Sequence, residues 1–146
     1  MFNDTLTMKG RLDIVLIGPD GSEKDRRTVD NLVVTTGKNY VASRMAGTSS
    51  AVMSHMAIGT SATAAAAGDT ALGTEAARTA LTSSTVNSNE VVYVDTFAAG
   101  TGTGAITEAG VFNASSGGTM LCRTVFSAVN KSANDGLTIT WSVQAS

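Results

Sequence analysis

The stretch from Gly104 to Phe126 alternates in the way that extended strands require. In its first part, GAITEAGVF, every second residue would face the same side of a strand. In the return segment, Met120, Cys122, Thr124 and Phe126 share one side. Between the two parts lies Asn113–Gly118, a run of turn residues with two glycines that can adopt positive φ. This spacing predicts an antiparallel β-hairpin with a long loop.

Other segments show the same period of two. In Leu137–Val143 the apolar residues alternate with Thr and Ser, which predicts a final strand with Trp141 in the core. A first hairpin is predicted from Lys9–Ile17 and Glu23–Val34, with a turn at Gly18-Pro-Asp-Gly21. Further strands are expected at Val52–Ile58, Thr79–Asn87 and Glu90–Ala99. About eight such strands predict an all-β, mainly antiparallel fold, either a β-sandwich or a jelly roll.

One short helix is expected near residues 36–46. Thr35 or Thr36 is a candidate N-cap and Gly47 a candidate C-terminal stop. Tyr40, Val41 and Met45 would share one face. We therefore expect this helix to cover one opening of the sheet structure.

The whole chain, residues 1–146, is predicted to form a single β domain. Within it we expect the N-terminal hairpin at about 9–34, the helix at about 36–46 and the sandwich strands at about 52–144. The small-residue stretch Thr60–Gly73 predicts a loop, and Thr74–Ala80 a further short turn. The glycine-rich stretch Ala98–Gly104 predicts a flexible connection. Its Gly100–Gly104 part is not expected to bind phosphate, because it lacks the Lys-Ser/Thr pair and the following helix of a phosphate-binding loop.

Composition excludes several kinds of partner. Charged residues make up 15% of the chain and the net charge is −2, so no basic surface for nucleic acid is expected. No apolar run has the length of a membrane span, and Met1–Gly10 lacks the apolar core of a signal peptide, so we expect synthesis in a cytoplasm. The single cysteine, Cys122, excludes an internal disulfide, and its apolar neighbours predict a buried thiol.

Two catalytic arrangements are conceivable from residue types. His55, the only histidine, would need Ser54 or Ser83 and Asp95 to form a triad. The chain has no G-x-S-x-G motif, so we predict a structural or interface histidine instead. One histidine and one cysteine, far apart in the sequence, also argue against a zinc site, which needs clustered ligands.

Glu108 and Asp95, on strands expected to be neighbours, would be a candidate glycosidase pair. Aromatic residues are only 5% of the chain, too few for a sugar platform. We instead expect Glu108 to pair with Arg78 or Arg123, or to accept backbone N–H groups. The acidic residues of Asp69–Arg78 predict an ordered loop held by local ion pairs. The sequence thus predicts no catalytic, cofactor-binding or metal-binding residues.

Several segments, taken in order, resemble a family of small virion proteins of tailed bacteriophages. They are Gly37–Ala42, Met56–Thr60, Asp69–Glu75 with Arg78, Ile106–Phe112, Gly118–Phe126 and Leu137–Trp141. The resemblance covers about Val33 to Val143 and implies a non-enzymatic structural protein. Capsid decoration (cement) proteins, tail fibres and baseplates all contain similar modules.

Because the chain ends soon after Trp141, with no long shaft, the resemblance favours a cement protein over a tail component. It implies a homo-oligomer on the outer surface of the phage head, with the major capsid protein as partner and no nucleic acid or membrane. The charged first hairpin would serve as an electrostatic contact arm. A tail-fibre, baseplate or tail accessory protein is the alternative, and a carbohydrate-binding β-sandwich a more distant one.

Overall fold

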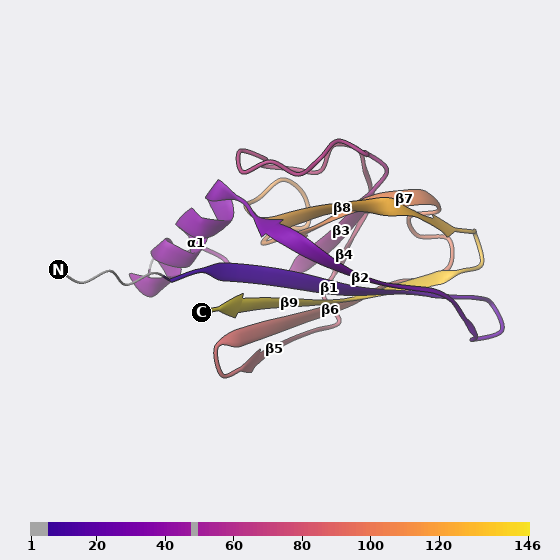
Figure 1. Ribbon diagram of the computed structural model, residues 1–146, viewed down its shortest axis with the longest axis horizontal. Coiled ribbons are helices and arrows are strands. Elements are labelled where there is room, and N and C mark those ends of the chain that lie inside the picture. Colours follow the sequence, from indigo (N-terminus) through magenta and orange to yellow (C-terminus); the bar gives the residue numbers. More distant parts are fainter. Residues whose placement is uncertain (1–5, 48–49) are drawn as a thin grey trace.

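The computed structural model describes residues 6–47 and 50–146, which form one helix and nine strands (Figure 1). The first half contains β1 (Met8–Ile17), β2 (Glu23–Val33), α1 (Thr35–Met45), β3 (His55–Gly59) and β4 (Glu75–Ala80). The second half contains β5 (Ser83–Asn87), β6 (Glu90–Phe97), β7 (Gly104–Phe112), β8 (Met120–Lys131) and β9 (Gly136–Ala145). This confirms the predicted all-β fold with one short helix.

All strands belong to one curled, antiparallel sheet in the order β4-β3-β7-β8-β2-β1-β9-β6-β5. The two end strands, β4 and β5, are consecutive in the chain. Between them, Leu81 N–H donates to Ser54 O and Thr82 N–H donates to Val94 O. Through residues 81–82 the chain thus passes from β4 at one end of the strand order to β5 at the other, and the curled sheet has the two facing layers of a sandwich (Figure 1).

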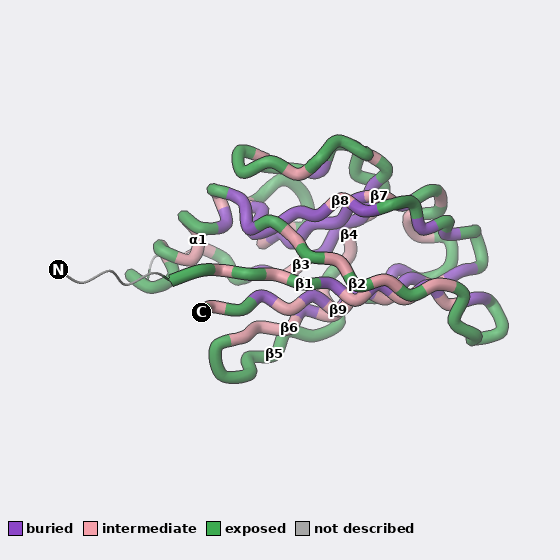
Figure 2. The backbone as a smooth tube through the Cα atoms, viewed as in Figure 1, coloured by how far each residue is buried: buried purple, intermediate pink, exposed green. Residues whose placement is uncertain are grey.

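The core lies between these layers, where the alternating apolar residues meet (Figure 2). Across the β1–β9 pair, Leu12 lies opposite Trp141, Ile14 opposite Ile139 and Leu16 opposite Leu137. All six side chains are buried, as is Cys122 on β8. Both the predicted burial of Cys122 and the predicted core position of Trp141 are confirmed.

The helix α1 lies at the end of the molecule where β9 ends (Figure 1). Tyr40 and Val41 pack against the core, as expected for a helix over an opening of the sheet. Gly37 allows the close approach, because a Cβ there would lie 2.0 Å from Leu121 O. Gly47, at φ 72°, confirms the predicted stop, and its N–H donates to Arg44 O.

The predicted N-cap is wrong, because Val34 occupies that position without a side-chain cap. Thr35 begins the helix, and the Thr36 hydroxyl donates to Met120 O on β8 instead. The tertiary contact has replaced the local one.

In the described residues, no helix combines the length and apolarity that a membrane crossing needs.

Three strand predictions need correction. The segment predicted as a short turn, Thr74–Ala80, contains β4, because pairing with β3 outweighs the weak strand preference of its Ala and charged residues. The strand expected from Val52 begins only at His55, and β8 extends to Lys131. The described chain accordingly contains nine strands where about eight were expected.

The turn at Gly18–Gly21 is confirmed by the Gly21 N–H bond to Gly18 O, and the charged residues beyond it form exposed ion pairs such as Arg26–Glu23. Lys24 reaches across to Asp135 in the β8–β9 connection, with 2.9 Å between Nζ and Oδ2. The first hairpin thus has exposed ion pairs of its own and one ion pair to the β8–β9 connection. The N-terminal stretch expected not to be a signal peptide lies partly outside the described residues.

Candidate functional site

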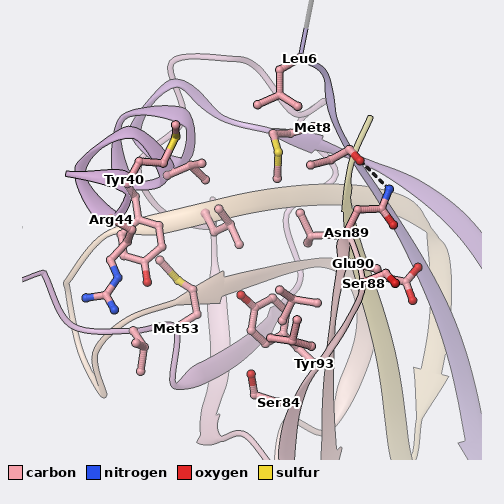
Figure 3. A pocket seen from close by; sticks show the side chains of 18 residues that line it. Leu6, Met8, Tyr40, Arg44, Met53, Ser84, Ser88, Asn89, Glu90 and Tyr93 are labelled. Carbon is pink, nitrogen blue, oxygen red and sulfur yellow. Dashed lines mark hydrogen bonds between the residues drawn. The ribbon is translucent and has the colours of Figure 1, made fainter. Parts of the chain in front are cut away.

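An apolar pocket of about 650 Å³ opens at the end of the sheet beside α1 (Figure 3). Its walls come from α1, the start of β1, the segment before β3 and the β5–β6 hairpin. Figure 3 shows Tyr40 and Met53 on one side, Leu6 and Met8 on another, and Ser84 and Tyr93 on a third. The pocket therefore lies where the curled sheet is open.

Exposed apolar side chains gather around this pocket. Five large hydrophobic residues of the described chain are exposed, and four of them line it. These four are Leu6 (65% exposed), Met45 (79%), Val52 (58%) and Val86 (74%). Scattered single hydrophobic residues on a surface need no explanation, but a contiguous group marks a contact site. We call these four residues the mouth patch.

Few polar groups reach into the pocket. Burial raises the pKa of the Tyr93 hydroxyl, with smaller contributions from nearby Cys122 and Tyr40, so this group stays neutral. Arg44 and Glu90 are the charged lining residues, and Arg44 Nη1 already donates to Ser50 O at 2.8 Å. A pocket with such walls suits a binding partner whose apolar side chains are bordered by neutral hydrogen-bonding groups.

The candidate triad is not assembled in the geometry that nucleophilic catalysis requires. Ser54 Oγ lies 2.7 Å from His55 Nδ1, the ring nitrogen that a triad reserves for its carboxylate. Asp95 instead accepts from the Thr79 hydroxyl at 2.5 Å and from Thr96 N–H at 2.9 Å. Ser83 belongs to β5, at the exposed edge of the sheet.

Asp95 is nevertheless buried on β6. Desolvation raises the pKa of its carboxyl group, against the opposing effects of the two hydrogen bonds and of His55. Asp95 thus links β6 to β4, where the two ends of the curled sheet meet.

Glu108 is fully buried and serves as the anchor of the loop between β3 and β4. Its carboxylate accepts the backbone N–H groups of Ser61, Gly73 and Thr74 at 2.8–2.9 Å. It also accepts from Arg123 Nε and Nη2, at 3.2 and 3.0 Å. Desolvation opposes its ionisation, but these donors outweigh it and hold the pKa below the ordinary value.

The structural interpretation of Glu108 is therefore confirmed, with Arg123 and backbone N–H groups as its partners. The assumption that Glu108 and Asp95 lie on neighbouring strands is wrong. β7 lies between β3 and β8, whereas β6 lies between β9 and β5. The strand order, which local sequence does not specify, separates the two carboxylates.

The expected local ion pairs of the Asp69–Arg78 segment are half right. Glu75 pairs with Arg78 at 2.7 Å, but Asp69 pairs with the distant Arg123 at 2.9 Å. Arg78 also stacks over the Phe112 ring, 3.7 Å from its centroid. The loop is thus held by long-range contacts.

No group of three or more potential metal ligands occurs within residues 6–47 and 50–146. The mouth patch was not predicted from the sequence. The available signal was apolar residues outside the alternating runs, such as Val52 and Met45. Comparison with known proteins found no matching family model, curated protein or solved structure.

Proposed function

We propose that this chain is a non-enzymatic structural protein of a tailed-bacteriophage particle that acts by binding other virion proteins. The observation that carries the proposal is the mouth patch, where four of the five exposed large hydrophobic residues of the described chain surround one apolar pocket. Removing such a patch from water favours protein association. Charged residues make up only 15% of the chain, so few charged groups would oppose this association.

The engagement of the acidic residues supports the non-enzymatic part of the proposal. Glu108 is occupied by five donors from the β3–β4 loop and Arg123. Asp95 is occupied by Thr79 and Thr96. Glu108 therefore holds the β3–β4 loop, and Asp95 links β6 to β4. A hydrolytic activity that His55→Ala abolished in a folded variant would contradict this part.

Within the virion we favour capsid cement, bound to the outside of the head and stabilising the lattice of the major capsid protein. This choice follows the resemblance of the segments between Val33 and Val143 to phage virion proteins. A protein that binds only the assembled lattice stabilises it by mass action. A tail-fibre, baseplate or tail accessory role is the alternative, because the same apolar surface would serve either location.

The test uses phage particles that lack the protein, to which purified wild-type or variant chains are added. Wild type should co-sediment with the heads and raise the temperature at which DNA is released. Met45→Gln and Val52→Gln should weaken binding at least about tenfold, as for residues at the centre of an interface. Leu32→Gln is the matched control, because Leu32 is exposed (37%) but does not line the mouth pocket.

Two outcomes would overturn parts of the proposal. If particles without the protein held DNA equally well but failed to adsorb to host cells, the tail alternative would replace cement. If the two mouth-patch variants bound as tightly as Leu32→Gln and wild type, the mouth patch would not be the docking surface.

A further inference from the structure

The strand β5 is an unprotected sheet edge beside the mouth patch. It lies at one end of the strand order and, within the described residues, pairs only with β6. All five of its residues, Ser83–Asn87, are exposed. They include no charged residue and no proline, two of the means by which proteins prevent an edge from pairing with another chain.

The pairing with β6 shows which backbone groups face outward. The hairpin turn consists of Ser88, at φ 57°, and Asn89, and it is closed by Asn87 opposite Glu90. The pair that closes a two-residue turn exchanges hydrogen bonds, and bonding then alternates along the strand. Ser83, Thr85 and Asn87 therefore bond to β6, and the N–H and C=O groups of Ser84 and Val86 point to the free edge.

The opposite end of the sheet differs. There β4 carries Glu75 and Arg78, which pair with each other, and Thr79 donates to Asp95 on β6. That edge thus has both charges and a partner. Within residues 6–47 and 50–146, the β5 edge combines outward backbone groups with a large exposed apolar side chain, that of Val86 (74%), which also lines the mouth pocket.

We propose that two copies of this chain dimerise by antiparallel pairing of their β5 strands about a two-fold axis at Thr85. This register places Ser84 of each copy opposite Val86 of the other, so the outward backbone groups of one meet those of its partner. It also pairs all five residues of the strand. Centring the axis on Ser84 or Val86 would leave residues at one end unpaired.

Charge supports a second copy as the occupant. A strand that meets itself in reverse brings any charge near an identical charge, which is destabilising, but β5 is neutral along its whole length. The pairing also covers part of each Val86 side chain with the other copy. The dimer deepens the proposed function by naming one of its protein contacts, yet it requires no particle and is tested without one.

The test is disulfide trapping in the otherwise native chain. In non-hydrogen-bonded antiparallel pairs, opposite Cα atoms lie about 4.5 Å apart, within the range of a disulfide. Thr85→Cys should therefore form a covalent dimer rapidly with oxidised glutathione, seen on a non-reducing gel. The native Cys122 is buried and burial raises the pKa of its thiol, so it should not contribute.

Ser83→Cys is the matched control, on the same exposed strand and the same face as Thr85. Across the proposed axis, the two Ser83 positions are four residues apart along the strand, roughly 13 Å, which is too far for a disulfide. Ser83→Cys should therefore stay uncoupled. Equal rates of coupling for the two variants would show random collision and overturn the proposal.

Light scattering supplies a second measurement on chains without added cysteine. Wild type should have the mass of a dimer at a concentration where Ser84→Pro has the mass of a monomer. Proline at 84 removes an outward donor without removing a bond to β6. A monomeric wild type that still binds phage heads would overturn the dimer and leave the proposed function intact. A wild type that is a dimer but fails to bind particles would overturn the proposed function and leave the dimer intact.

Discussion

Arg123 Nη2 lies 3.0 Å from Glu108 Oε1, and both side chains are buried. The same arginine reaches Asp69 Oδ2 at 2.9 Å and Thr63 O at 3.0 Å, so a pair on β7 and β8 holds the β3–β4 loop. These two buried charges thus shape the β3–β4 loop.

Glu108→Gln should destabilise the protein by about 3–5 kcal/mol, because it leaves the Arg123 guanidinium buried without its anion. It also replaces one acceptor oxygen with a donor that faces backbone N–H groups. Urea unfolding at neutral pH measures the loss. Glu23→Gln, in an exposed ion pair, is the control and should unfold like wild type. A loss below about 1 kcal/mol for Glu108→Gln would contradict the anchoring role.

The same variant has a pH signature. The lowered pKa of Glu108 means that its contribution is complete above its ordinary pKa of 4.5 and disappears as the pH falls through the lowered value. The free energy of unfolding of wild type should therefore exceed that of Glu108→Gln at neutral pH and lose this excess in acid. An advantage that stayed constant from pH 7 to pH 2 would show that the charge is not responsible.

Asp95→Asn should behave in the opposite way. The pKa of Asp95 is raised, chiefly by burial, so ionisation disfavours the folded state as the pH rises above the ordinary value of 3.8. The single amide oxygen can still accept the Thr96 N–H bond, and the amide NH2 can donate to the Thr79 hydroxyl oxygen, which in wild type donates to the other carboxylate oxygen. The variant should melt at a higher temperature than wild type at pH 7, with the difference shrinking as the pH approaches 3.8. A lower melting temperature at pH 7 than wild type would contradict this.

Gly59→Ala should displace the β3–β4 loop. A Cβ at Gly59 would lie 2.3 Å from Thr74 O and 2.6 Å from Glu108 Oε2. We expect a loss of about 1–3 kcal/mol, typical of overpacking, and faster proteolysis within residues 60–74. Gly68→Ala, in the same loop with nothing within 4 Å, should leave both measurements unchanged or slightly improved. Equal effects of the two substitutions would show that space at Gly59 is not critical.

Trp141→Ala should cost about 3–5 kcal/mol in a denaturant titration, as for other buried aromatic residues. Trp141→Phe should cost much less, because the indole Nε1 has no hydrogen-bond partner among the described residues. A loss below about 1 kcal/mol for Trp141→Ala would mean that the core rearranges freely around this site.

Much of this fold was predictable from the sequence. The alternation in Leu137–Val143 placed Trp141 in the core because side chains in a strand alternate whatever their neighbours are. The turn at Gly18–Gly21 and the helix stop at Gly47 were predictable for the same kind of reason, since proline and glycine restrict or release φ locally. The partners expected for Glu108 were also right in kind, because a buried carboxylate must be paired or hydrogen-bonded.

Only the tertiary structure decided which segments meet. Glu75–Ala80 becomes a strand because β3 offers it a backbone partner, although its own residues favour strands weakly. Asp95 and Glu108 lie on strands that are not neighbours because the strand order places β6 beside β9 and β5, and β7 beside β3 and β8. Leu6, Met45, Val52 and Val86 form one patch because the curl of the sheet brings α1, the start of β1, the segment before β3 and the β5–β6 hairpin to one opening. These are contacts between residues distant in sequence, and their energy depends on the path of the whole chain, so no local pattern encodes them.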